Sequence, residues 1–162
     1  MEQFEIFCSG YSIDDPGYAG SAAVIDKGEL MDTFSAHFAT KTSNAIAGLF
    51  AVIDGVEHVP PGSAVKIWST SHFVVNSIND GLVTLLGEEG QDVIPPEQAV
   101  AWDRLFKAVD NLSCFTIEYC PPPGCRLMKK AVRSAKLEAK KAAFSFSYTA
   151  KSYSLEVQVG NN

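Results

Sequence analysis

The sequence has no apolar run long enough to cross a membrane. The longest run, Ala45–Ile53, is closed by Asp54 and falls far short of the roughly 18 residues that a spanning helix needs. The start of the chain has neither the basic segment nor the apolar stretch of a secretory signal, so we expect a cytoplasmic protein with no membrane partner. The four cysteines lack the close pairs of a zinc site, and we expect neither disulfides nor a bound metal.

Basic residues are scarce in most of the chain. Residues 1–125 contain 5 Lys and Arg against 17 Asp and Glu, whereas residues 126–162 contain 8 against 2, and the whole chain has a net charge of −6. Binding to nucleic acid depends on contacts between Lys or Arg and phosphates. This charge distribution argues against nucleic-acid binding by the first 125 residues and leaves it open for the last 37.

The pattern of apolar residues predicts one α/β domain, since 162 residues with 46% apolar content fit a single core. We expect three strands joined by hairpins, then two strands reached through helices, which gives a mixed five-stranded sheet of three antiparallel and two parallel strands flanked by helices. The expected strands are Phe4–Cys8, Ala22–Asp26, Thr33–Ala39, Ala64–Trp68 and Phe115–Tyr119. The expected helices are 43–58, Ser71–Ile78, Gln98–Asn111 and Arg126–Ala143. Ser43 or Thr42 caps the first of these helices, and Ser69 or Thr70 opens the second.

The last residues, 144–162, alternate apolar and polar side chains as strands do. We expect a main domain over 1–143 and an extra C-terminal strand or hairpin in this tail. Such a hairpin packs on its own sheet, or it presents an edge to a second copy, forming a homodimer, or to a partner. The first of these outcomes is favoured.

Several stretches carry a more specific signal through their order and spacing. They are Phe4-Glu5-Ile6-Phe7, Pro16-Gly17 with Gly20 and Ala22-Ala23, Thr33-Phe34-Ser35-Ala36, Thr42-Ser43-Asn44, Ser69-Thr70-Ser71, Trp102 and Ile117-Glu118-Tyr119. Together they resemble type I ribonuclease H of bacteria, and the resemblance covers about residues 1–143. It implies the ribonuclease H-like sheet and helices described above.

The resemblance also implies what an active member needs. That family cuts the RNA strand of an RNA–DNA hybrid with two divalent metal ions held by four carboxylates, which are the hard ligands that Mg²⁺ prefers. At the matching positions this chain has Ser9, Ala47, Thr70 and Arg133. We therefore expect no metal cofactor and no nuclease activity.

Other residues suggest binding. Ser43 and Asn44, with His72 in place of a Gln, match positions that face the minor groove in the family. On the last helix, at 100° per residue, the cations fall within about 120° of arc and form one basic face. This face is either a binding surface for phosphates or for an acidic protein, or a solvated face near the helix C-terminus, where cations are favoured. These cations are Arg126, Lys129, Lys130, Arg133, Lys136 and Lys140.

The leading hypothesis is a catalytically inactive ribonuclease H-like protein that serves as an interaction or assembly subunit for a protein partner. A phage or other mobile element is the expected source, with the host cytoplasm as its location. One alternative is a non-cleaving protein that binds RNA or DNA weakly through the basic face. Another is an active metal-dependent ribonuclease with relocated ligands. A hydrolase rebuilt from Ser9, Thr70, Ser71 and His72 is disfavoured, because hydroxyls at strand-to-helix junctions usually cap helices.

Overall fold

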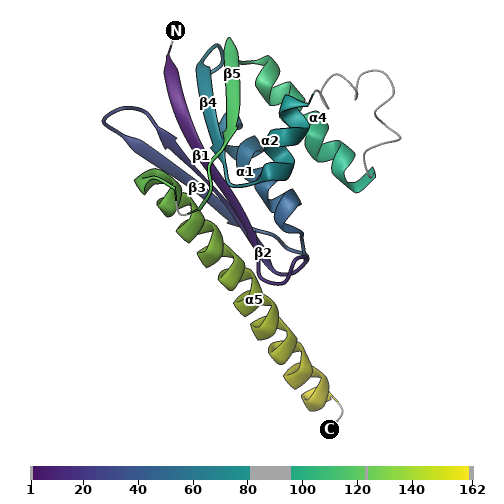
Figure 1. Ribbon diagram of the computed structural model, residues 1–162. Helices are drawn as coiled ribbons and strands as arrows, with labels where there is room; N and C mark the ends of the chain where they lie inside the picture. Colours follow the sequence, from purple (N-terminus) through teal and green to yellow (C-terminus); the bar gives the residue numbers. More distant parts are fainter. Residues whose placement is uncertain (1, 81–95, 123, 161–162) are drawn as a thin grey trace.

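The chain forms a five-stranded mixed sheet with helices on both faces, which confirms the expected fold class (Figure 1). The computed structural model describes residues 2–80, 96–122 and 124–160, and the side chains of 96–97 and 146–160 are not considered. Its elements are β1 (Gln3–Ser12), β2 (Ala19–Asp26), β3 (Met31–His37), α1 (Asn44–Glu57), β4 (Ala64–Ser69), α2 (His72–Asn79), α4 (Pro96–Asp110), β5 (Cys114–Tyr119) and α5 (Arg126–Gly160).

Strand β1 lies at the centre of the sheet, whose order is β3-β2-β1-β4-β5. It pairs antiparallel with β2 and parallel with β4, so that Ile6 stands between Ile25 and Ile67. All three isoleucines are fully buried. The parallel neighbour follows from the connection through α1, because only a crossover can return the chain in the same direction. The carboxyl ends of β1 and β4 therefore lie side by side.

The two faces of the sheet are covered by different helices. Helices α1, α2 and α4 cover one face, where Leu49 and Trp102 belong to the main core cluster. Helix α5 lies across β1, β2 and β3 on the other face, with small residues such as Ala135 turned inward (Figure 1). Gly20 makes this close approach possible, because a Cβ there would collide with the carbonyl oxygen of Ala135 and with Glu138. The cations of α5 are thus held at a fixed place beside the sheet.

Two boundaries differ from the sequence-based expectation. Strand β1 does not stop at Ser9 but continues to Ser12, because β2 also extends and pairs with it as far as Ala19. The cap of α2 is Ser71, not Ser69 or Thr70. The Ser71 Oγ accepts a hydrogen bond from the backbone N–H of Val74 at 3.3 Å, whereas Ser69 ends β4. For α1, Ser43 is the cap.

The expected C-terminal strand or hairpin is wrong. Helix α5 runs on to Gly160, so residues 144–160 are helical. Extending an existing helix adds one hydrogen bond per residue fixed, whereas a new hairpin must be nucleated. No proline and no glycine interrupts the chain between Arg126 and Val159. Among the helices described, none is both long and apolar enough to span a membrane.

Candidate functional site

A cleft of about 530 Å³ opens where β1 and β4 end and α1 and α2 begin. The walls combine hydroxyl, aromatic and amide side chains with a single cation and a single carboxylate. Its lining residues are Ser9, Gly10, Tyr11, Asp15, Asn44, Ala45, Thr70, Ser71, His72, Phe73, Pro122, Val132 and Lys136. The carboxyl ends of neighbouring parallel strands are a common place for ligands in α/β proteins. This cleft is the candidate site.

The hydroxyls of Ser9 and Thr70 meet in this cleft. The pairing of β1 with β4 places Cys8 opposite Ser69, so the next residues, Ser9 and Thr70, are neighbours. The Oγ1 of Thr70 donates to the Oγ of Ser9 at 3.1 Å, and the Thr70 backbone N–H donates to the carbonyl oxygen of Cys8. Ser9 is buried. Two uncharged hydroxyls that hydrogen-bond to each other therefore stand where the two strands end.

The other two positions singled out from the sequence lie elsewhere. Ala47 is fully buried, and its backbone lies directly against Gly10, so it forms no part of the cleft wall. Arg133 is exposed and lies outside the cleft, to which α5 contributes Val132 and Lys136. The match of Arg133 to the fourth carboxylate position of the family stays a prediction, and neighbouring side chains of a helix differ in direction by about 100°.

The polar groups at the start of α1 are largely used in folding. The Oγ of Ser43 accepts from the N–H of Ile46 at 3.2 Å, and Ser43 does not line the cleft. The Oδ1 of Asn44 accepts from the N–H of Ser12 at 2.6 Å, and the Asn44 N–H donates to the Oδ1 of Asp15 at 2.8 Å. The amide nitrogen of the Asn44 side chain donates in none of these bonds and can bind a ligand.

Two aromatic contacts shape the remaining walls. His72 is exposed and stacks on the ring of Tyr119, with ring centroids 3.5 Å apart. The Nζ of Lys136 lies over the ring of Tyr11, 5.4 Å from its centroid. The tyrosines were missed from sequence, where Tyr11 lay beyond the expected first strand and Tyr119 was an ordinary residue of the last strand. Pairing of β1 with β4 and of β4 with β5 would have placed them near the cleft.

The residues of this cleft do not fit a pair of divalent metal ions. Asp15 is the one carboxylate among the described residues of its lining, and one of its oxygens already accepts the Asn44 N–H. Within the described residues, no group of three or more His, Cys, Asp and Glu could hold a metal ion. Lys136 adds a positive charge to the wall, which opposes cation binding.

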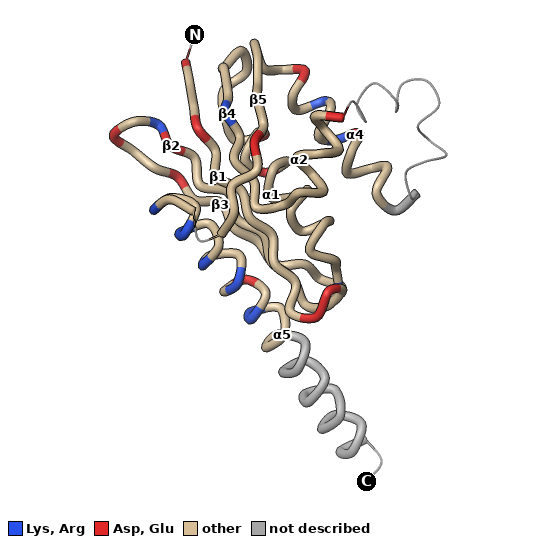
Figure 2. Tube along the Cα trace, in the orientation of Figure 1, with Lys and Arg blue, Asp and Glu red and all other residues tan. Residues whose placement is uncertain are grey.

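The basic face of α5 is a second feature of the site, and Figure 2 shows its Lys and Arg in a row along the helix. Lys141 pairs with the buried Glu138, but the six cations of the basic face form no ion pair within the described residues. The face also carries an apolar side chain, because Leu137 lies within the arc of the cations with 51% of its surface exposed. A shallow groove of about 300 Å³ runs along it.

Glu138 holds this helix to the edge of the sheet. Its carboxylate accepts hydrogen bonds from Ser35 and His37 of β3, each at 3.3 Å, and from Lys141 at 3.1 Å. Burial by itself would raise the pKa of Glu138, but the hydrogen bonds from Lys141, His37 and Ser35 outweigh it and hold the pKa below its usual value. The ionised carboxylate thus ties α5 to β3.

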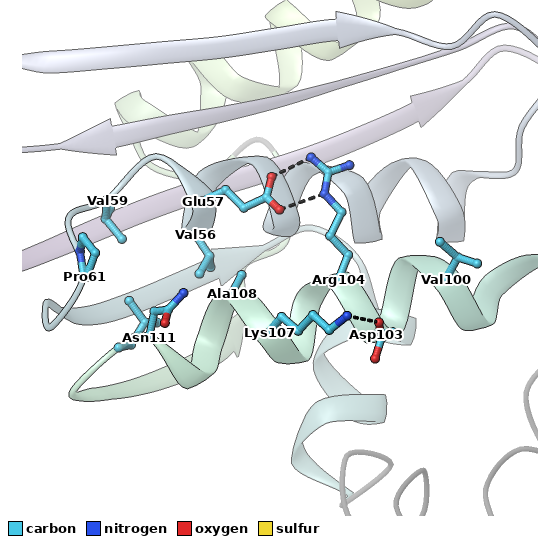
Figure 3. A pocket seen from close by; sticks show the side chains of 11 residues that line it. Val56, Glu57, Val59, Pro61, Val100, Asp103, Arg104, Lys107, Ala108 and Asn111 are labelled. Carbon is cyan, nitrogen blue, oxygen red and sulfur yellow. Dashed lines mark hydrogen bonds and ion pairs between the residues drawn. The ribbon is translucent and has the colours of Figure 1, made fainter.

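A pocket of about 430 Å³ lies between α1 and α4, away from all residues selected from the sequence (Figure 3). The Arg104 guanidinium donates two hydrogen bonds to Glu57, at 2.6 and 2.7 Å, and Lys107 pairs with Asp103 at 2.9 Å. The hydrogen bond to Glu57 raises the pKa of Arg104. Since these charged groups are already paired, the pocket offers a ligand little beyond its apolar wall.

The cysteines offer no nucleophile in the cleft. Cys8 is fully buried beneath it, and burial, with a smaller contribution from the nearby Asp54, raises the pKa of its thiol far above the ordinary value. A thiol must ionise to attack, so Cys8 is inert. Cys114 and Cys125 are exposed but do not line the cleft.

Comparison with known proteins places these features in a family. The profile described as RNase H matches residues 1–117. A ribonuclease H of Syntrophus aciditrophicus (strain SB) is 28% identical over 110 residues, which is 66% of this chain and 63% of that protein, so the chain matches less than two thirds of the relative's length. Among solved structures, the N-terminal RNase H domain of a Mycobacterium tuberculosis protein superposes with a TM-score of 0.70 at 19% identity, over 90% of this chain and 99% of that one. LC11-RNase H1, solved with an RNA/DNA hybrid, has a TM-score of 0.62 at 18% identity, over 86% and 99%.

Proposed function

Because this chain belongs to the ribonuclease H family, we propose that it uses the family's fold to bind a partner without cutting nucleic acid. The main support is the Ser9–Thr70 hydrogen bond of 3.1 Å at the ends of β1 and β4. Two-metal cleavage needs several negatively charged oxygens to hold both ions and to stabilise the attacking and leaving oxygens. Paired neutral hydroxyls, a buried alanine and a lysine supply none of that charge.

The partner we favour is a protein, with this chain as an assembly subunit. The outward side of α5 presents exposed cations together with the exposed side chain of Leu137. Protein interfaces combine apolar and charged side chains, and this surface offers both. The acidic composition of residues 1–125 disfavours a large contact with phosphates elsewhere on the molecule.

Nucleic acid is the second candidate, and one observation favours it. Lys136 lines both the cleft and the groove on α5, so the cations of the helix continue into the cleft. Relatives have been solved with RNA/DNA hybrids, among them LC11-RNase H1 and a foamy viral protease-reverse transcriptase. On this hypothesis binding is weak and depends steeply on salt.

Cleavage of a labelled RNA–DNA hybrid in Mg²⁺ or Mn²⁺ tests the loss of activity. We expect none from the purified full chain, with an active ribonuclease H as the positive control. The informative variant is Asp15→Asn, which keeps the oxygen that accepts the Asn44 N–H but removes the one carboxylate of the cleft lining. Cleavage that EDTA abolishes and Asp15→Asn reduces would overturn the proposal, whereas cleavage that the variant leaves unchanged comes from a contaminant.

Fluorescence anisotropy with labelled hybrid, duplex and single strands separates the two partners. If nucleic acid is bound, the affinity falls steeply between 50 and 200 mM salt and Lys136→Glu weakens it, as expected for contacts with phosphates. Lys107→Glu on α4 is the matched control, since Lys107 is exposed but distant from the cleft. Absence of binding at 50 mM salt would leave the protein partner as the proposal.

A further inference from the structure

We propose that the outward face of α5 binds an acidic segment of a partner protein whose apolar side chains pack on Leu137. This inference rests on the proposed function, because it names the chemistry of the partner that the assembly subunit would take. The face consists of exposed residues on one side of the helix. They are Arg126, Lys129, Lys130, Arg133, Lys136, Leu137, Lys140 and Phe144.

The geometry of the helix gathers these residues into one surface. At 100° per residue, Arg133, Leu137 and Lys140 fall within about 60° of arc, and Phe144 lies two turns beyond Leu137 on the same side. Leu137 is 51% exposed and Phe144 is 73% exposed. The inward side, which includes Ala135, is buried on the sheet. Two exposed apolar side chains therefore lie within the arc of the cations, and the cations of the groove lie on one side of Leu137.

Helix electrostatics do not account for this placement of cations. The sequence suggested that they lie near a helix C-terminus, where positive charge is favourable, but α5 begins at Arg126 and extends to Gly160. The cations thus occupy the N-terminal half, and the first turn has no acidic residue. Positive charge in the first turn interacts unfavourably with the helix dipole. A binding partner that neutralises the charge would remove this cost.

The exposed leucine distinguishes a protein partner from nucleic acid. Phosphate contacts require cations and gain nothing from an apolar side chain at the centre of the contact. A partner segment with acidic and apolar residues neutralises the cations and covers Leu137 at the same time, which is the usual way for an amphipathic helix to bind a groove. The groove of about 300 Å³ around Leu137 is lined by Lys129, Arg133, Lys136 and Lys140, so charge complementarity selects an acidic segment.

Two labelled peptides of equal negative charge test this inference on the full-length chain. One carries leucines at positions i, i+4 and i+7 between glutamates, and the other has serines in their place. We expect the leucine peptide to bind about tenfold more tightly, because it buries apolar surface that the serine peptide lacks. Leu137→Ser should abolish this difference, whereas Val100→Ser, at an apolar position on α4 that is 78% exposed, should preserve it.

Three results would overturn the inference. Equal affinity for the two peptides, or no effect of Leu137→Ser, means that charge alone directs binding. Tighter binding to a 20-base-pair duplex than to the leucine peptide means that nucleic acid is the partner. A dimer in solution that Leu137→Ser dissociates, measured by light scattering, means that the face pairs with a second copy. Each of these leaves the hybrid-cleavage result unchanged, so failure here is distinct from failure of the proposed loss of activity.

Discussion

Glu138 is the charged residue that ties the basic helix to the sheet, and its replacement tests this role. The variant Glu138→Ala removes the acceptor of three hydrogen bonds, from Ser35, His37 and Lys141. The side chain of Glu138 is only 10% exposed, but those of His37 and Lys141 are 45% and 64% exposed. Hydrogen bonds to a charged group contribute about 1.5–3 kcal/mol each when shielded, and exposed partners contribute much less.

The expected loss of unfolding free energy is therefore about 2 kcal/mol, or roughly 4–8 °C in melting temperature for a chain of this size. Urea titration that follows tryptophan fluorescence measures it, since Trp102 is fully buried. The control is Asp103→Ala, which removes the exposed i,i+4 pair with Lys107 on α4 and should cost less than about 0.5 kcal/mol. Equal losses in the two variants would refute the anchoring role.

The same contact has a defined pH dependence. Folding lowers the pKa of Glu138 below its usual value of 4.5, so the native state stabilises the ionised carboxylate. The stability that it contributes is fully present above the unfolded pKa and is lost as the pH falls through the lower folded value. The difference between wild type and Glu138→Ala should be constant near neutral pH and shrink below about pH 4. A difference that grows with acidity would contradict the direction of the shift.

Three further predictions concern the core, a helix cap and the packing of α5. Iodoacetamide should label Cys114 in the native protein but Cys8 only after unfolding, because burial raises the Cys8 pKa; mass spectrometry of the digest shows which is modified. Ser71→Ala should lower the unfolding free energy by about 1 kcal/mol through loss of the α2 cap, while Ser77→Ala within the same helix has no such effect on the urea midpoint. Gly20→Ala should cost at least about 2 kcal/mol, because its Cβ meets backbone atoms of α5, and a wild-type melting temperature would refute that contact.

The strands and the first helices could be predicted because each depends on a local pattern. Apolar alternation and Pro-Gly breaks marked the five strands within a few residues, and hydroxyl caps marked the starts of the first helices. The sheet order then followed from the connections between the strands. The tail could not be predicted in this way. The alternation of apolar residues in the tail would form a strand only if the tail paired with a sheet edge. The helix that precedes the tail has no interruption and continues through it instead.

The site was predicted in part, and the reason lies in how each element fixes side-chain direction. Ser9 and Thr70 could be placed together because strand pairing brings their residues side by side. Which side chains of α5 line the cleft could not be predicted to the residue, because a shift of one residue turns a helical side chain by about 100°; the lining includes Val132 and Lys136. The contact of Lys136 with Tyr11 joins residues distant in sequence, and no local pattern indicates it.

Binding of Mn²⁺ to the purified chain tests the central claim most directly, because it measures the cleft's capacity for metal without any need for a substrate. Electron paramagnetic resonance of free Mn²⁺ during titration counts bound ions per chain. The account predicts no stoichiometric site at millimolar Mn²⁺, since Asp15 is the one carboxylate that the described part of the chain places in the cleft lining and Lys136 adds positive charge. Two bound ions per chain that Asp15→Asn releases would contradict it.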